Sequence, residues 1–312
     1  MNKEKNFVSA VVYVHNSEQY IVKFLENLIN VFEEKFEHSE IICVNDYSDD
    51  DSTKIIKEMS SQAVSTSMSL VNLSYYHGIE LAMNAGLDLS IGDFVYEFDS
   101  TFVDYNADEI MSIYKKALEG YDIVSASPNR KEKISSRSFY YAFNRFGNFS
   151  SKMQTERFRV LSRRVINRVS SMNKSVPYRK AVYANCGLKT INVRYNVLTE
   201  SKCHKITKDE QKYRKDLAFD TMILFTGVGY RFSIAMTVFM MVIAMFMMIY
   251  SFGVYFTSNP VAGWTTTILF LAITFFGLFA ILTVVIKYLQ ILVDLIFRRK
   301  RYNFESIEKL TK

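Results

Sequence analysis

Two aspartates follow short apolar runs, and their positions give the first indication of chemistry. Asp46 comes soon after residues 41–44, and Asp99 directly follows residues 94–98. Parallel sheets bind ligands at the carboxyl ends of their strands, so two acids at this spacing predict one shared site. A single acidic loop at a strand end is common, and the prediction therefore depends on the pair.

Positive charge is concentrated in one stretch of the chain. Between Arg130 and Arg168 there are eleven Lys or Arg residues and two acids, whereas the whole chain has a formal charge of +6. A basic stretch of this kind suits the phosphates of nucleotides, lipid headgroups or nucleic acids. A solvated basic helix face would give the same pattern, and the sequence leaves both interpretations open.

Alternating β-rich and helical patterns must position these side chains. We predict strands at residues 7–14, 41–44, 70–73, 94–98 and 123–126, and helices at 17–36, 51–59, 78–90 and 107–118. This alternation is typical of an α/β domain with a mostly parallel sheet. The three cysteines have no metal-ligand spacing, and the polar N-terminus lacks the apolar core of a signal peptide.

Two long uncharged runs follow near the C-terminus. Residues 232–256 and 265–286 contain no charged side chain, and each run exceeds the ~20 residues that cross a bilayer core. Basic residues flank the pair on both outer sides, which predicts that both termini lie in the cytoplasm. The predicted organisation is a domain at 1–206, an amphipathic juxtamembrane segment at 207–231, transmembrane helices at 232–256 and 265–287, an extracytoplasmic turn at 257–264 and a basic cytoplasmic tail at 288–312.

An ordered set of motifs resembles the family 2 glycosyltransferases. Residues 11–16 (VVYVHN) are similar to a family strand that ends in P-x-Y-N-E, and residues 40–50 (EIICVNDYSDD) are similar to E-I-I-x-V-D-D-G-S-x-D. Residues 78–99 follow the pattern G-x-x-x-A-x-x-x-G…G-D…D, and residues 158–163 (FRVLSR) resemble F-R-L-x-S-R. Together with two terminal apolar runs, the set is similar to the polyprenyl-phosphate glycosyltransferases, the subgroup of bactoprenol glucosyltransferase and dolichol-phosphate mannose synthase.

The resemblance implies a GT-A fold, which is a Rossmann-like α/β domain, on the cytoplasmic side of the inner membrane. It implies inverting transfer of a sugar from a nucleotide-diphospho-sugar to a polyprenyl phosphate such as undecaprenyl phosphate, for modification of a cell-envelope glycan. The implied cofactor is Mg²⁺ or Mn²⁺, and the lipid bilayer is an implied partner. A homo-oligomer is compatible with this interpretation, whereas the predicted membrane hairpin argues against nucleic acid.

Roles carried over from the family fall on particular residues of this chain. Asp99 would hold the metal, with Thr101 at the second position of the D-x-D motif, because a hard cation prefers oxygen ligands and offsets charge on the leaving diphosphate. The candidate catalytic acids are Asp99 and Glu156. The candidate donor-binding residues are Tyr13, His15, Asn16, Asp46 and Ser48. The candidates for binding the diphosphate or the acceptor phosphate are Arg130, Arg137, Arg159, Arg163 and Lys212. For each arginine a structural role is equally open.

The chain departs from the family at two positions that matter for catalysis. Thr101 replaces the second carboxylate of D-x-D, for which Glu97 or Asp104 could compensate, and Arg157 replaces the acid before F-R-L. An acceptor phosphate is mostly ionised near pH 7 and needs no general base, so transfer to a lipid phosphate is the favoured interpretation. The alternative is a degenerate, non-catalytic membrane protein that binds lipid phosphate or a partner enzyme. A glycan or protein acceptor would need a base for its hydroxyl and is disfavoured.

Overall fold

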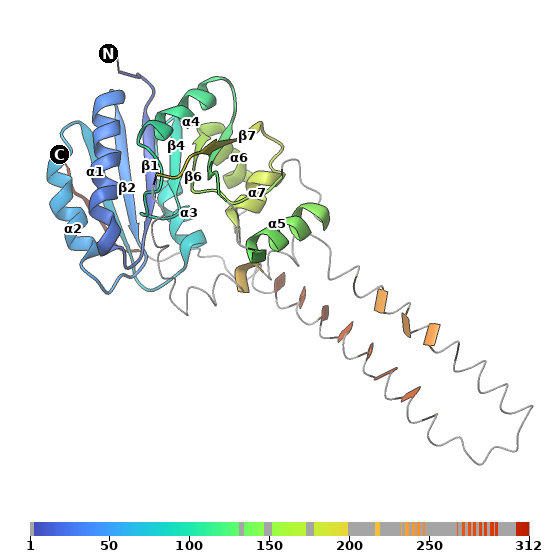
Figure 1. Ribbon diagram of the computed structural model, residues 1–312. Helices are drawn as coiled ribbons and strands as arrows, with labels where there is room; N and C mark the ends of the chain where they lie inside the picture. Colours follow the sequence, from blue (N-terminus) through green and yellow to red (C-terminus); the bar gives the residue numbers. More distant parts are fainter. Residues whose placement is uncertain are drawn as a thin grey trace, which may run out of the picture. The chain divides into compact units, whose positions relative to one another are not determined.

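The computed structural model describes residues 3–130, 134–146, 152–172, 178–198, 216–218 and 304–311, with scattered positions between 232 and 292. The chain divides into two compact units, Met1–Ala218 together with Arg299–Lys312, and Phe219–Arg298. The first unit is an α/β domain around a sheet in which eight strands are described (Figure 1). This confirms the predicted fold class for that unit.

The described elements of the first unit include every strand and helix that the sequence predicts. The strands are β1 (Val8–Val14), β2 (Ser39–Asn45), β3 (Thr66–Leu73), β4 (Phe94–Phe98), β5 (Ile123–Pro128), β6 (Phe158–Ser162), β7 (Thr190–Tyr195) and β8 (Phe304–Lys309). The helices are α1 (Glu18–Lys35), α2 (Ser52–Met59), the 3-10 helix η1 (Ser60–Gln62), α3 (Ile79–Leu89), α4 (Asp108–Leu118), α5 (Ile134–Phe146), α6 (Arg163–Met172) and α7 (Arg179–Asn185).

Strand β3 begins at residue 66 instead of the predicted residue 70. Its first half alternates between the buried Thr66 and Met68 and the partly exposed Ser67 and Ser69. The start of this strand was predicted from a continuous apolar run. A strand that alternates between apolar and polar residues contains no such run, so its first half was not recognised.

The strand order is β7-β5-β6-β4-β1-β2-β3-β8. The pairs β1–β2, β1–β4, β2–β3 and β5–β7 are parallel, whereas β6 and β8 run antiparallel to the strands beside them. Strands β2 and β4 therefore flank β1 and end at the same edge of the sheet. With neighbouring strands about 4.8 Å apart, these two ends lie about 10 Å from each other. Since Asp46 and Asp99 follow β2 and β4, the two predicted acids share one edge.

Each face of the sheet packs against its own set of helices. Along β1, Val8, Val12 and Val14 belong to the apolar core that includes α1, α2 and α4, whereas Val11 belongs to the core that includes α3 and α6. This alternation is expected of strands that are buried on both faces. Gly86 of α3 permits a close approach of that helix, because a Cβ at this position would clash with Cγ1 of Val11.

The C-terminal end of the chain returns to the sheet as β8, which pairs with β3 (Figure 1). Nδ2 of Asn72 donates to Oγ of Ser306 at 2.9 Å, and the amide of Met68 donates to Oγ1 of Thr311 at 2.8 Å. From the sequence this segment was predicted to be part of a basic tail, and the strand was not predicted. Only two of the six residues of β8 are apolar, and their spacing of three is not the period of a strand.

The second unit is described only at scattered positions. The predicted transmembrane helices at 232–256 and 265–287 lie for the most part outside the described residues, as does the juxtamembrane segment at 207–231, and the turn at 257–264 lies wholly outside them. Within the part of the chain that is described, no helix combines the length and apolar character that a membrane crossing requires. The two transmembrane helices stay predictions from the sequence.

Candidate functional site

Asp46 lies at the end of β2 and is fully buried. Its carboxylate accepts hydrogen bonds from the backbone amides of His77 and Gly78, both at 2.8 Å, and from the hydroxyl of Tyr13 at 3.1 Å. Gly78 has a φ of 83°, a conformation that favours glycine. Burial raises the pKa of Asp46, although these hydrogen bonds oppose the shift. The Asp46 carboxylate therefore joins β1, β2 and the turn that begins α3.

The other predicted donor-binding residues lie beside Asp46. Nδ1 of His15 is 2.8 Å from the carbonyl oxygen of Asp46. Oδ1 of Asn16 accepts a hydrogen bond from the amide of Asp49 at 2.9 Å, and the amide of Asn16 donates to Oγ of Ser48 at 3.1 Å. The structure thus brings all five predicted donor-binding residues together at the ends of β1 and β2.

Aromatic rings surround this end of the sheet, and most of them were missed by the sequence analysis. The ring of Tyr75 stacks on His77 with a centroid distance of 3.9 Å, and the ring of Tyr76 packs against His15 at 4.8 Å. Tyr75 and Tyr47 are 53% and 50% exposed, so each leaves part of its ring open. Such rings can stack on a nucleobase. The sequence Tyr-Tyr-His shortly after β3 could have indicated these rings. The end of β3 lies at the same edge of the sheet as the ends of β1 and β2.

A row of polar side chains crosses the neighbouring half of the sheet. Glu97 of β4 lies opposite Arg159 of β6, Arg159 lies opposite Ser125 of β5, and Ser125 lies opposite Asn192 of β7. Glu97, Arg159 and Ser125 are almost fully buried. Their neighbours along the strands belong to the apolar core on the other face. Four strands therefore each contribute one polar residue at the same level, on the face that packs against α3 and α6.

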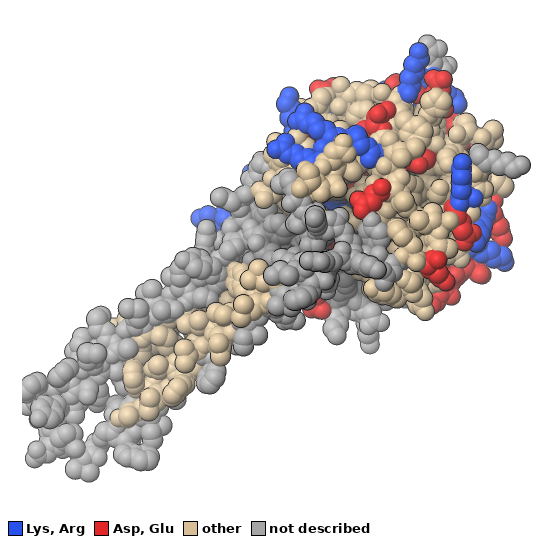
Figure 2. Space-filling view, turned by 180° about the vertical axis from the view of Figure 1, so that it is seen from behind, with Lys and Arg blue, Asp and Glu red and all other residues tan. Residues whose placement is uncertain are grey.

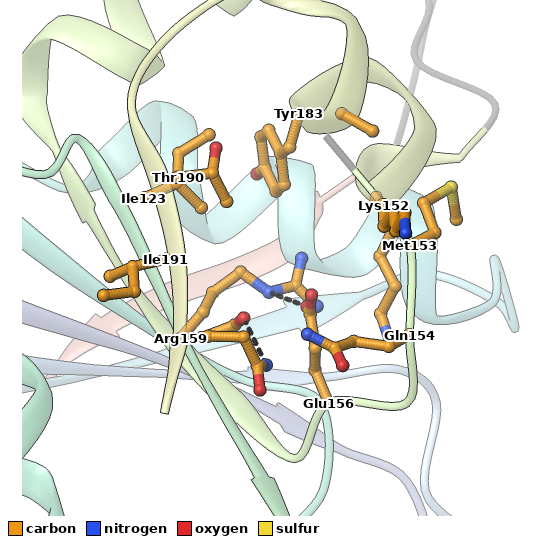
Figure 3. Close-up of a pocket in the computed structure, with 13 residues that line it drawn as sticks. Ile123, Lys152, Met153, Gln154, Glu156, Arg159, Tyr183, Thr190 and Ile191 are labelled. Atoms are coloured by element: carbon orange, nitrogen blue, oxygen red, sulfur yellow. Dashed lines mark hydrogen bonds and ion pairs between the residues drawn. The ribbon is translucent and has the colours of Figure 1, made fainter. Parts of the chain in front are cut away.

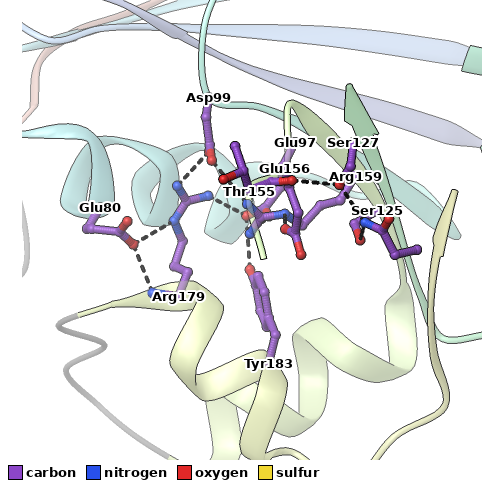
Figure 4. A network of polar contacts seen from close by, with 11 residues as sticks. Glu80, Glu97, Asp99, Ser125, Ser127, Thr155, Glu156, Arg159, Arg179 and Tyr183 are labelled. Carbon is purple, nitrogen blue, oxygen red and sulfur yellow. Dashed lines mark hydrogen bonds and ion pairs between the residues drawn. The ribbon is translucent and has the colours of Figure 1, made fainter. Parts of the chain in front are cut away.

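Two buried arginines bind four carboxylates on this face (Figure 4). Arg179, the first residue of α7, lies 3.0 Å from Glu80, 2.6 Å from Glu97 and 2.8 Å from Asp99. Arg159 lies 3.0 Å from both Glu97 and Asp99 and 3.2 Å from Glu156. Both arginine side chains are 1% exposed, so these carboxylates and not water balance their charge. We call this group the arginine cluster; its members are Arg159, Arg179, Glu80, Glu97, Asp99 and Glu156.

The arginine cluster determines the charge state of Asp99. Burial raises the pKa of this carboxyl, but Arg179, Arg159 and Lys180 together hold it well below the usual range of an aspartate. Oδ1 of Asp99 accepts a hydrogen bond from Arg179, and Oδ2 accepts one from Arg159. Asp99 is therefore ionised at neutral pH and is already paired with two cations, while 19% of its side chain stays exposed.

Arg157, at the position of the family's acid, is bound to a separate carboxylate. Its Nε and Nη2 donate to Asp104 at 3.0 and 2.6 Å, and the hydroxyl of Tyr195 donates to the same carboxylate at 2.9 Å. Asp104 and Glu97 were the two alternatives that could compensate for the carboxylate missing at Thr101. Both acids are instead held by arginines, so neither is free to take that role in this arrangement.

A cavity of about 220 Å³ lies beside the arginine cluster (Figure 3). Strands β5, β6 and β7 form one wall, where Nδ2 of Asn192 donates to Oγ of Ser125 at 2.8 Å. Arg159 and Glu156 point toward each other in this cavity, which places the candidate acid Glu156 at its wall (Figure 3). The residues that give the lining its charge are Lys152, Glu156, Arg159 and Lys180.

The other predicted phosphate-binding residues lie outside the arginine cluster. Nε of Arg163 donates to the carbonyl oxygen of Gly92 at 2.9 Å. Gly92 lies before the start of β4, and the arginine cluster lies at the end of that strand. The five residues of β4 separate the two places by about 17 Å. Arg163 therefore has the structural role that the sequence left open. Arg130 follows β5 and Arg137 lies on α5; both are exposed and stay candidates. Lys212 lies outside the described residues. Exposed basic side chains gather on one part of the face shown in Figure 2.

The described residues do not offer an open site for Mg²⁺ or Mn²⁺. No three or more His, Cys, Asp or Glu side chains among them are arranged to hold a metal ion. Both oxygens of Asp99 are bonded to arginines, and Thr101 supplies a hydroxyl where the family has a carboxylate. The donor set in this arrangement therefore does not fit the implied cation, which prefers several free oxygen ligands.

Comparison with known proteins identifies relatives of this chain. Residues 9–172 match the model of Glycosyl transferase family 2. An uncharacterized glycosyltransferase of Synechocystis sp. is 28% identical over 196 residues, which cover 61% of this chain and 60% of that protein. A prophage bactoprenol glucosyl transferase homolog of Escherichia coli (strain K12) is 30% identical over 196 residues, covering 60% of this chain and 62% of that protein. The chain thus spans less than two thirds of the length of either relative.

A solved structure supports the fold. A mannosyltransferase from Pyrobaculum calidifontis in complex with GDP-Man and Mn²⁺ superposes with a TM-score of 0.51 at 15% sequence identity. The superposition covers 65% of this chain and 59% of that protein. At this identity the likeness concerns the GT-A-like arrangement of the sheet and its helices.

Proposed function

Because this chain belongs to glycosyl transferase family 2, we propose that it transfers a sugar from a nucleoside-diphosphate sugar to a polyprenyl phosphate. The observation that carries the proposal is the common edge of β1, β2 and β4, at which both the donor candidates and Asp99 of the arginine cluster lie. The bactoprenol glucosyl transferase homolog among the relatives supports a lipid phosphate as acceptor.

The proposed reaction is an in-line substitution at the anomeric carbon of the sugar. An oxygen of the acceptor phosphate forms the new bond as the bond to the nucleoside diphosphate breaks, so the configuration inverts and the diphosphate leaves with the electron pair. A phosphate monoester has a second pKa of about 6, so the acceptor already carries an oxyanion near pH 7. No general base is then required, which agrees with the pairing of Arg157 to Asp104.

The residues of this chain have distinct parts in the proposed reaction. Tyr47 and Tyr75 offer partly open rings for the nucleobase, and Asp46 holds the loop that positions them. Glu156 faces the cavity and is available to bind hydroxyl groups of the sugar. A bound Mg²⁺ or Mn²⁺ would offset charge on the leaving diphosphate, and the family implies Asp99 and Thr101 as its ligands. Because these residues do not fit a cation as arranged, no step of the mechanism uses one.

We further propose that residues 232–256 and 265–287 cross the inner membrane, with the domain and both termini in the cytoplasm, and that the lipid product serves modification of a cell-envelope glycan. Two single cysteine substitutions test the orientation: Asn259→Cys in the predicted turn and Val64→Cys at a side chain that is 92% exposed. A membrane-impermeant maleimide added to intact cells should label position 259 and should label position 64 only after lysis. Labelling of position 64 in intact cells would refute this topology.

Transfer itself is tested with membranes that contain the full chain. We expect radiolabel from UDP-glucose, UDP-N-acetylglucosamine or GDP-mannose to enter the organic phase only when undecaprenyl phosphate is present. Tyr75→Ala should raise the KM of the donor about 5- to 150-fold, since stacking on one base is worth about 1–3 kcal/mol. Tyr141→Ala, which removes another exposed tyrosine from α5, is the matched control. Absence of labelled lipid with every donor, beside a working control enzyme, would refute transfer.

A second function is favoured by two observations, the occupied carboxylate of Asp99 and the arginine at position 157. In this alternative the domain binds a nucleotide sugar or lipid phosphate and transfers nothing. Thermal unfolding distinguishes the two, because a ligand that binds only the folded state raises the midpoint whether or not it reacts. A raised midpoint with UDP or GDP together with no transfer would favour the non-catalytic protein.

A further inference from the structure

We propose that the cavity beside the arginine cluster binds a phosphate or diphosphate group through Lys152 and Lys180, without a divalent cation at Asp99. This inference rests on the proposed function and deepens it, because it names the groups that take the charge of the diphosphate or of the acceptor phosphate. Neither lysine is among the residues that the sequence analysis selected.

The first observation is that both oxygens of Asp99 already accept a hydrogen bond from a buried arginine. Arg179 donates to Oδ1 at 2.8 Å and Arg159 donates to Oδ2 at 3.0 Å. These arginines are themselves held by other carboxylates, since Arg179 also binds Glu80 and Glu97. A cation at Asp99 would therefore have to displace an arginine that is buried in three ion pairs, which leaves that arginine without a partner in a site closed to water.

The second observation is the electrostatic field around Asp99. The guanidinium groups of Arg179 and Arg159 lie 2.8 and 3.0 Å from its carboxylate, one at each oxygen. The same positive groups repel a divalent cation placed at this carboxylate. Asp99 then acts as a positioning residue for Arg159 and Arg179.

The third observation is the charge of the cavity wall. Lys152 is exposed and Lys180 is partly exposed, and within the described residues neither ammonium group forms an ion pair with a carboxylate. They stand on different segments, Lys152 in the loop before β6 and Lys180 on α7, so an anion between them is contacted from two sides. Ammonium groups with free donors bind phosphate oxygens well.

The fourth observation concerns the most buried charged residue of the cavity wall. Nε and Nη1 of Arg159 lie 3.2 and 3.0 Å from Glu156 and Glu97 but lack the geometry of hydrogen bonds. This guanidinium is 1% exposed and lines the cavity, so its positive charge lies at the wall that an entering anion meets. A cavity of about 220 Å³ with charged side chains in its wall can hold a phosphate group with several waters. Lys152 and Lys180 would then supply the positive charge that a leaving diphosphate needs.

Binding of inorganic pyrophosphate to the purified full chain tests the proposal. We expect calorimetry in the presence of EDTA to show binding, and the double variant Lys152→Met/Lys180→Met to weaken it at least tenfold. Lys189→Met removes an exposed lysine just before β7, outside the cavity lining, and should bind as the unchanged chain does. Unchanged binding by the double variant, or binding that appears only when Mn²⁺ is added, would overturn the proposal.

A second measurement follows the cation directly. Titration of Mn²⁺, monitored by electron paramagnetic resonance, should show no stoichiometric site in the unchanged chain. A site that Asp99→Asn abolishes would overturn the inference. Neither measurement depends on sugar transfer. Pyrophosphate binding without sugar transfer would support this inference and reject the proposed function. Sugar transfer that requires Mn²⁺ would support the proposed function and reject this inference.

Discussion

Arg179→Met should destabilise the first unit strongly, because it removes one of the two cations of the arginine cluster. The unchanged cluster has two arginines and four carboxylates; the variant leaves Glu97, Asp99 and Glu156 with Arg159 and leaves Glu80 without an arginine. Removing one partner of a buried ion pair costs about 3–5 kcal/mol. In a domain of about 200 residues, each kcal/mol lowers the unfolding midpoint by about 2–4 °C. The expected decrease is therefore about 6–20 °C.

The pH dependence of this variant gives a second, independent test. Arg179 helps to hold the pKa of Asp99 below its usual range, so the stability that Asp99 contributes is present above about pH 4 and is lost as pH falls toward its folded pKa. In Arg179→Met the pKa of Asp99 rises, and protonation relieves the repulsion among the unpaired acids. The difference in midpoint between the variant and the unchanged chain should therefore be largest near pH 7 and should narrow below pH 4.

The assay is thermal unfolding of the purified full chain, followed by far-UV circular dichroism. Arg194→Met, which removes an exposed arginine from β7, is the matched control and should change the midpoint little. The double variant Arg179→Met/Glu80→Gln should recover part of the loss, because it removes the carboxylate whose arginine partner was Arg179. An Arg179→Met midpoint equal to that of the unchanged chain, with no dependence on pH, would refute the ion pairs described for the cluster.

Three further outcomes are expected. Burial raises the pKa of Glu33, but hydrogen bonds from Ser65 and from the amides of residues 64–66 lower it to about 2. Glu33→Gln should therefore lower the thermal unfolding midpoint at pH 7, and the midpoints of variant and unchanged chain should coincide near pH 2. A midpoint difference that persists at pH 2 would contradict this. Arg157→Leu should leave Asp104 buried without its cation and cost about 3–5 kcal/mol in urea unfolding, while a loss below 1 kcal/mol would argue against the pair. Gly86→Ala should cost about 1–3 kcal/mol by overpacking against Val11, and an unchanged urea midpoint would disprove the close approach of α3.

Much of the fold follows from sequence periodicity. The first strand and first helix have the clear patterns of a fully buried strand and an amphipathic helix, and both match the structure within one residue at each end. The common edge for Asp46 and Asp99 follows from the parallel order of β1, β2 and β4, since strand-end residues of adjacent parallel strands meet. Local patterns were sufficient because each of these elements buries a regular set of side chains.

The arginine cluster could not be predicted in the same way. Arg179 binds Glu80 and Glu97 from 99 and 82 positions away, and no local pattern distinguishes it from an exposed arginine. Its burial depends on how α7 packs against the sheet, which is a property of the tertiary structure. The metal-binding role that the family implies for Asp99 gives no indication that Arg179 lies beside it. Arg159 was selected for its phosphate-binding chemistry, but its place opposite Glu97 comes from the antiparallel insertion of β6 beside β4.

The pairing of β8 with β3 has a consequence for synthesis of the protein. Phe304 is translated 231 positions after Leu73, the last residue of β3. At about 5–20 residues per second, the ribosome needs about 12–46 s to reach it. During that interval the growing chain has the outer edge of β3 without its partner, and unpaired strand edges invite pairing with other chains. The segment that protects this edge is therefore translated long after the edge itself.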